Sequence, residues 1–144
     1  MRVVVQRSGK AKLKSDGKDY SSIEKGLMIL VGFTEGDGLD EIKWMVNKIV
    51  NLRIFDDEEG VMNKSILDVG GEILSVSQFT LYGDCKKGSR PSYIKALNGD
   101  KASPLYDKFN EELSRYVKVS TGVFGSDMEI NFTNIGPVTI IIEK

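Results

Sequence analysis

The sequence predicts a mixed α/β fold in which a sandwich-like or barrel-like β-sheet core packs two main helices on one side. Short β-branched and apolar runs typical of strands lie near both ends of the chain, at residues 3–5 and 138–142. Helical periodicity is confined to residues 37–52 and a stretch beginning at Ser103, unlike the strict alternation of a doubly wound nucleotide-binding fold. The 144 residues contain no repeat or linker, so we expect one domain over residues 1–144.

The N-terminal half is expected to form a hairpin, a buried strand and a helix. Residues 3–5 and 27–31 are apolar runs typical of strands buried on both faces, and the Asp-Gly pair at 16–17 marks a hairpin turn between them. Apolar side chains recur at steps of three and four over residues 37–52, which predicts an amphipathic helix with an acidic first turn. Residues 53–60 predict a short strand followed by a turn.

The C-terminal half is expected to form a long strand, a second helix and two returning strand segments. Residues 72–82 predict the long strand. Ser103 is a good N-cap with Pro104 at the first helical position, so the second helix is expected to begin there. Apolar and polar residues alternate over 130–133, and a buried run follows over 138–142, for a total of six to eight strands.

The composition excludes several kinds of catalytic site. The chain has no histidine, which removes Ser-His-Asp triads, Cys-His pairs and His-ligated zinc. Its single cysteine, Cys85, forms neither an intrachain disulfide nor a Cys-rich metal site, and it suits a reducing compartment. There is no secretion signal, and the longest apolar run covers only residues 27–31. We therefore expect a cytoplasmic protein with no metal and no cofactor.

Charge is spread unevenly along a chain whose net charge is −1. Residues 1–25 contain seven basic and three acidic side chains, and residues 84–101 contain five and two, whereas residues 35–59 contain eight acidic side chains against three basic. Such basic stretches suit contact with a polyanion such as RNA, although surface decoration gives the same pattern. Neither a membrane nor DNA is expected as a partner.

The loop over residues 83–90 approximates a phosphate-binding loop. Ser89 stands where that motif requires lysine, and the following proline disfavours an immediate helix, so a nucleotide triphosphatase is rejected. Lys86, Lys87 and Arg90 are candidates for binding phosphate as a basic loop, and a solvated charged turn is the alternative.

A polar segment interrupts the predicted strand over residues 72–82. Period-two geometry places Ser77 and Phe79 on one face and Gln78 and Thr80 on the other. Buried hydroxyl and amide groups must form hydrogen bonds or cost roughly 1–3 kcal/mol each. Two interpretations stay open: a satisfied cross-strand network, or a polar pocket whose hydroxyls and backbone N–H groups orient a substrate and stabilise an oxyanion.

Thr80 is a candidate covalent nucleophile, but no histidine exists to activate its hydroxyl and no local motif pairs it with a lysine. A positioning role ranks above a nucleophilic one.

Pro137, preceded by Gly136, removes a ladder hydrogen bond and belongs at a bend or edge of the sheet. A trans peptide bond is the default there, because only ~5–6% of X-Pro bonds are cis.

Two motifs resemble the signatures of D-aminoacyl-tRNA deacylases. They are Ser-Gln-Phe-Thr-Leu-Tyr at residues 77–82 and Asn-x-Gly-Pro-Val-Thr at residues 134–139, and the likeness extends nearly end to end. The resemblance implies a homodimeric, cytoplasmic hydrolase that cleaves the ester between a D-amino acid and the terminal adenosine of tRNA. It also implies removal of glycine mischarged onto alanine tRNA, and rejection of L-aminoacyl-tRNA.

The resemblance also implies the roles of individual residues. A cis Gly136-Pro137 unit reaches into the partner subunit's pocket and excludes L side chains. The residues around the ester are Ser77, Gln78, Thr80 and the backbone of Phe79, with Phe124 and Met128 as walls around the adenosine or amino acid. The ester is already activated, so a positioned water, a backbone oxyanion site and the tRNA 2′-hydroxyl suffice without a side-chain base.

The chain departs from the family pattern at Ser-Gly-Lys-Ala-Lys-Leu, residues 8–13, where small and β-branched residues are usual. This departure leaves a supporting role for Arg7 beside the Gly-Pro unit open. If the substrate is tRNA, Lys86, Lys87 and Arg90 are weak candidates for contact with its acceptor stem. Two other hypotheses remain: a hydrolase that uses Thr80 as nucleophile, and a tRNA-binding protein without catalysis.

Overall fold

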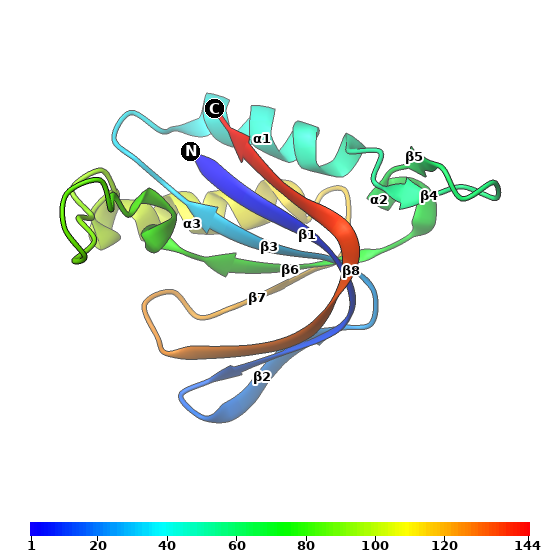
Figure 1. The fold of residues 1–144 in the computed structure, drawn as a ribbon, viewed down its shortest axis with the longest axis horizontal. Helices are drawn as coiled ribbons and strands as arrows, with labels where there is room; N and C mark the ends of the chain where they lie inside the picture. The colour runs from blue at the N-terminus through cyan, green and yellow to red at the C-terminus, as the bar shows by residue number, and fades with distance from the viewer.

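The computed structural model describes residues 1–144 and consists of one curled six-stranded sheet, a small two-stranded sheet and helices on one side (Figure 1). The large sheet has the order β2-β1-β3-β6-β7, and β8 pairs with the other side of β1. Its strands are β1 (Arg2–Ser15), β2 (Lys18–Ile23), β3 (Gly26–Gly32), β6 (Glu72–Ser77), β7 (Val119–Thr121) and β8 (Met128–Glu143). The predicted class, a barrel-like mixed α/β core, is confirmed.

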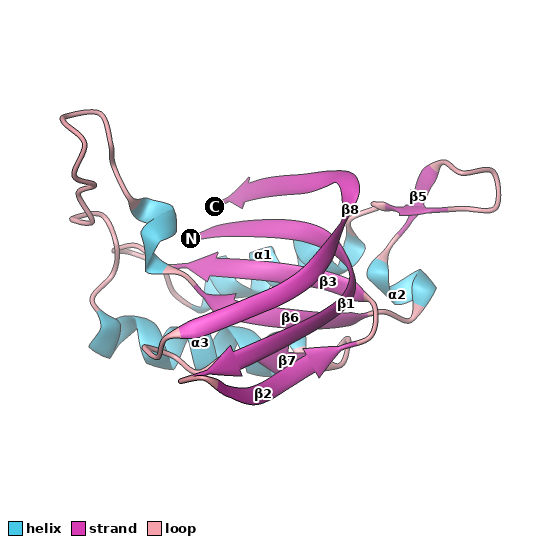
Figure 2. Ribbon diagram, turned by 60° about the horizontal axis from the view of Figure 1, so that its bottom comes forward, coloured by secondary structure: helices cyan, strands magenta, loops and turns pink.

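The two main helices are α1 (Leu39–Asn51) and α3 (Gly99–Leu113), and Figure 2 shows both behind the same face of the sheet. The smaller elements are β4 (Phe55–Asp56), β5 (Met62–Lys64), the one-turn helix α2 (Ile66–Val69) and the 3₁₀ helix η1 (Phe79–Tyr82). The helix predicted over residues 37–52 is confirmed, because its periodic apolar side chains are the ones that α1 buries, among them Ile42, Met45 and Ile49. None of the helices is long and apolar enough to cross a membrane.

The long strand β1 joins two hydrophobic cores. Near its start, Val3 and Val5 belong to a cluster of 21 buried residues between the sheet and the helices. Near its end, Ala11 and Leu13 belong to a second cluster of six buried residues inside the curl of the sheet. Strand β1 pairs with β3 over its first half and with β2 over its second half. The buried side chains of the first half belong to the larger core, and those of the second half belong to the smaller one.

Two predicted boundaries are wrong. Helix α3 begins at Gly99 rather than at Ser103, because the side chain of Asn98 caps it by accepting a hydrogen bond from the Asp100 N–H at 3.0 Å. Pro104 consequently lies inside the helix. The strand predicted over residues 72–82 ends at Ser77, and the chain turns into η1.

The C-terminal strand also differs from the prediction of two separate segments. Strand β8 is continuous through residues 134–139, and its register with β1 shifts between Gln6 and Ser8. The Gly136–Pro137 peptide is cis, not the trans default. The short strand β7 was not predicted, because three residues are too few for a periodic pattern.

Gly26 allows the parallel strands β3 and β6 to meet. Its φ is +145°, and a Cβ added there would lie 1.9 Å from the Glu72 carbonyl oxygen. We expect Gly26→Ala to lower the free energy of unfolding by about 3 kcal/mol, because both the backbone conformation and the strand contact are lost. Urea unfolding measures the change. Gly9→Ala is the control, since its added Cβ makes only contacts of 3.7 Å or more, and equal stability of the two variants would contradict the prediction.

Candidate active site

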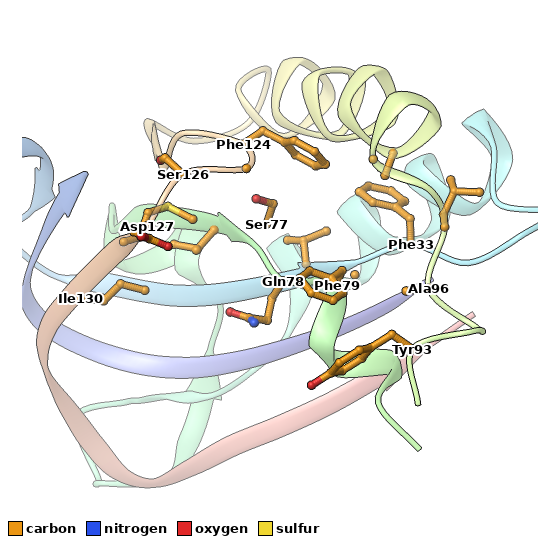
Figure 3. Close-up of a pocket in the computed structure, with 18 residues that line it drawn as sticks. Phe33, Ser77, Gln78, Phe79, Tyr93, Ala96, Phe124, Ser126, Asp127 and Ile130 are labelled. Atoms are coloured by element: carbon orange, nitrogen blue, oxygen red, sulfur yellow. The ribbon is translucent and has the colours of Figure 1, made fainter. Parts of the chain in front are cut away.

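A cavity of about 650 Å³ opens between the end of β6, the start of α3 and the loop that joins β7 to β8 (Figure 3). Eighteen residues line it, and eleven of these are hydrophobic. They include Ser77, Gln78 and Phe79 from the end of β6, Phe124 and Met128 from the other side, and Phe33, Tyr93, Leu97 and Ala102. The structure thus brings five of the predicted site residues to one cavity.

Ser77, Gln78 and Phe79 reach the cavity because the chain leaves the β-sheet at the end of β6. Ser77 pairs with Val31 of β3, and the Gln78 N–H still donates to the Val31 carbonyl at 2.7 Å. The chain then turns into η1, so period-two alternation stops, and both Gln78 and Phe79 reach the cavity. The prediction that Gln78 and Phe79 lie on opposite faces of one strand is therefore wrong.

The polar side chains of this segment are not buried in a cross-strand network. Phe79 and Thr80 are exposed, and Gln78 is half-buried. The amide of Gln78 donates to the Thr80 hydroxyl within the same segment. Thr80 itself does not line the cavity, so its link to the cavity is the hydrogen bond to Gln78. Of the two interpretations left open, the pocket describes the side chains better than the network.

Gly122 and Tyr106 support the wall of the cavity that Phe124 and Met128 form. A Cβ added to Gly122 would lie 2.6 Å from the Met128 sulfur, so glycine there makes room for Met128. The Phe124 ring packs 6.0 Å from the ring of Tyr106. The Tyr106 hydroxyl donates to the Ser75 carbonyl at 2.8 Å, and burial raises the pKa of Tyr106. This contact links α3 to β6 directly behind the cavity.

Asp127 is the only charged residue among the cavity's lining. It is exposed at the mouth, and the rest of the lining consists of apolar side chains with neutral hydroxyl and amide groups. A mostly apolar concave site with one carboxylate and a few neutral polar groups suits a small organic group whose reacting atoms meet the end of β6.

Gly136 and Pro137 do not line this chain's cavity; they form an exposed bend in β8. The bend is held from one side by Arg7, whose guanidinium donates to the carbonyls of Ile135 and Gly136, each at 3.4 Å. The same guanidinium donates to the Ile54 carbonyl at 3.0 Å and forms an ion pair of 3.1 Å with Asp56. Arg7 is therefore in contact with the Gly-Pro unit despite the unusual segment that follows it.

Lys86, Lys87 and Arg90 also lie outside the cavity. All three are exposed in the loop after η1, drawn in green at the left of Figure 1. Backbone hydrogen bonds of 2.8 and 2.9 Å between Asp84 and Ser92 close this loop at its base. The predicted basic loop thus leaves the body of the protein next to the predicted catalytic segment.

Phe33, Tyr93 and Leu97 belong to the site but were not predicted from the sequence. They come from loops that meet only in the folded chain, where the Leu97 N–H donates to the Phe33 carbonyl at 2.9 Å. The one feature of the sequence that could have indicated part of this set is Tyr93, an aromatic residue just after the basic loop.

A family profile described as D-Tyr-tRNA(Tyr) deacylase matches residues 4–143. Among curated relatives, a D-aminoacyl-tRNA deacylase of Bacteroides thetaiotaomicron is 55% identical over 99% of this chain and 97% of its own length. A protein of the same name from Clostridium acetobutylicum is 53% identical over 100% and 97%. The relatives and this chain therefore match over nearly their whole lengths.

Two solved structures share the architecture. A structure titled "c-Myc DNA Unwinding Element Binding Protein" superposes with a TM-score of 0.94 at 38% identity, covering 100% of this chain and 99% of its own. A structure titled as a probable eukaryotic D-amino acid tRNA deacylase superposes with a TM-score of 0.82 at 20% identity, covering 98% and 97%, and this second likeness concerns the fold alone.

Proposed function

The chain belongs to the D-Tyr-tRNA(Tyr) deacylase family of ester hydrolases that act on aminoacyl-tRNA, and we propose that it releases D-amino acids from tRNA while leaving L-aminoacyl-tRNA intact. The observation that supports this most directly is the mostly apolar cavity bounded on one side by Ser77, Gln78 and Phe79. Its volume of about 650 Å³ suits a terminal adenosine together with an amino acid.

The proposed chemistry is hydrolysis with assistance from the substrate. Water attacks the ester carbonyl carbon, and the backbone N–H of Phe79 stabilises the oxyanion that forms. The bond from that carbon to the ribose 3′-oxygen then breaks, and the proton released by the water reaches the leaving oxygen through the neighbouring 2′-hydroxyl. Ser77 and Gln78 hold the ester and the amino group against this segment, so no side chain has to act as a general base.

Thr80 acts as a positioning residue in this scheme, because its hydroxyl accepts from the Gln78 amide outside the cavity. We expect Thr80→Ala to lower kcat by about tenfold, since Gln78 loses a hydrogen-bond partner but no nucleophile is removed. Single-turnover hydrolysis of D-tyrosyl-tRNA measures the change. A fall of several orders of magnitude, together with an acyl group trapped on the wild-type protein, would instead establish Thr80 as a covalent nucleophile.

The chirality filter is proposed to come from a second copy of the chain. Gly136 and Pro137 are exposed and face no substrate in their own chain, so they suit insertion into a partner's cavity. The sheet beside them offers an apolar surface for the contact: Val4, Leu30 and Ile141 are register neighbours, and the Ile141 side chain is 65% exposed. The proposed assembly is a homodimer with two composite sites.

A filter that rejects L side chains by occupying their position accepts an amino acid with no side chain. Glycine mischarged onto alanine tRNA is therefore part of the proposed substrate range, and the cytoplasm is the proposed compartment. No metal and no cofactor has a role in the proposed chemistry.

The test measures hydrolysis of three charged tRNAs by the purified protein. They are a D-aminoacyl-tRNA, the matching L-aminoacyl-tRNA and alanine tRNA mischarged with glycine. We expect release of the D-amino acid and of glycine, with the L ester stable. Salt-dependent binding of tRNA without cleavage of any ester would favour the alternative of a tRNA-binding protein.

A further inference from the structure

The rim of the cavity contains an exposed pair of aromatic rings, and the proposed chemistry uses neither ring. The rings of Phe79 and Tyr93 meet edge to face, with centroids 5.1 Å apart and an interplanar angle of 71°. Phe79 is 56% exposed and Tyr93 is 40% exposed. Figure 3 shows both side chains on the same side of the cavity, with Tyr93 farther from Ser77 and Phe124. Phe79 therefore borders the position of the ester with its backbone, whereas the Tyr93 ring lies farther out along the same side of the cavity.

The Tyr93 ring is held in place by the main chain on both sides. The hydrogen bonds between Asp84 and Ser92 anchor the residue before it, and the Ala96 N–H donates to the Tyr93 carbonyl at 2.9 Å. Gly83 gives the ring a flat backing, because a Cβ at Gly83 would lie only 3.1 Å from the Tyr93 Cε1 atom. An exposed aromatic ring fixed in this way offers a surface for stacking at little entropic cost.

The loop that ends at Tyr93 supplies unpaired positive charge. Lys86, Lys87 and Arg90 are exposed and form no ion pair, and Asp84 at the base of the loop contacts Lys95, two residues beyond Tyr93, at 4.0 Å. Aromatic side chains next to unpaired cations are the usual surface for single-stranded nucleic acid, since bases stack on the rings while phosphates meet the charges.

We propose that Tyr93, backed by Phe79, stacks on a base of the single-stranded 3′ end of tRNA, next to the terminal adenosine, while Lys86, Lys87 and Arg90 contact the phosphates. The inference rests on the proposed function, which places the terminal adenosine in the cavity. A strand that leaves the cavity past Phe79 meets Tyr93 first and the basic loop next. Tyr93 is thereby a residue that selects tRNA over a free aminoacyl nucleoside, and it does not take part in the chemistry.

The test separates these two substrates. With Tyr93→Ala we expect kcat/KM for D-tyrosyl-tRNA to fall roughly tenfold through KM, because one base loses its stacking partner. The loss should be several-fold smaller on D-tyrosyl-adenosine, which lacks that base. Tyr93→Phe should retain activity on both. Tyr116→Ala is the matched control, since Tyr116 is also exposed but lies beyond the far end of α3.

Equal losses on tRNA and on the nucleoside ester would place Tyr93 in the ester pocket and overturn the proposal, as would no loss on either. If the wild-type protein cleaves neither ester, the proposed function fails, and the stacking is tested by binding of uncharged tRNA. Tyr93→Ala is then expected to raise its Kd roughly tenfold. The double substitution Lys86→Ala and Lys87→Ala should lower the slope of log Kd against log salt concentration by about 1.4, since each contact with a single-strand phosphate accounts for about 0.7.

Discussion

Gly136→Ala is expected to lower hydrolysis of D-tyrosyl-tRNA by about 100-fold while leaving the stability of each chain unchanged. Within one chain an added Cβ at Gly136 meets no atom within 4 Å, and its φ lies outside the left-handed region, so the fold has no reason to suffer. In the proposed dimer the same methyl group enters the partner's cavity and displaces the ester from the end of β6. The measurement is single-turnover hydrolysis beside urea unfolding.

Gly9→Ala is the control for Gly136→Ala, since it adds a methyl group to β1 with ordinary contacts only. Wild-type hydrolysis by Gly136→Ala would mean that the bend never meets the substrate. Ile135 and Gly136 would then be held by Arg7 for stability alone.

Gly32→Ala is expected to lower kcat by about 100-fold with a smaller change in KM. An added Cβ there would lie 2.9 Å from the Gln78 carbonyl oxygen and 3.3 Å from the Leu81 Cβ. Backbone atoms have to move to relieve this contact, so the Phe79 N–H leaves the position from which it stabilises the oxyanion. Steady-state kinetics on D-tyrosyl-tRNA measure the split between kcat and KM. An unchanged kcat in a folded variant would show that the end of β6 does not stabilise the transition state.

Mixing the two variants tests whether the site is shared between subunits. A heterodimer of Gly136→Ala with Gly32→Ala contains one site built from an intact cavity and an intact bend, so activity should reappear after joint refolding. If each bend serves its own chain, every site in the mixture has one defect, and no activity returns.

The elements with a clear apolar period were predictable, and the ones determined by a cap or by a neighbouring strand were not. Helix α1 buries its periodic side chains as expected. The start of α3 was missed because Asn98 and Ser103 are both good caps, and local sequence does not rank them. The end of β6 was misplaced because apolar residues continue into η1, where only the folded sheet shows that the ladder has ended.

The site was predictable where a motif is continuous and was missed where loops assemble it. Ser77, Gln78 and Phe79 follow one another in the chain, and Phe124 and Met128 lie close together near the start of β8, so family resemblance indicated all five. Phe33 and Tyr93 are 60 positions apart in the sequence and meet only around the cavity. No local pattern indicates that two residues so far apart line the same cavity.

The most direct test of the account is the ratio of hydrolysis rates for matched D- and L-tyrosyl-tRNA with the purified protein in the presence of a metal chelator. The account predicts that the D ester is cleaved and that the L ester decays no faster than without protein. Cleavage of both esters would contradict the chirality filter at Gly136 and Pro137. Cleavage of neither would contradict the proposed metal-free deacylation itself.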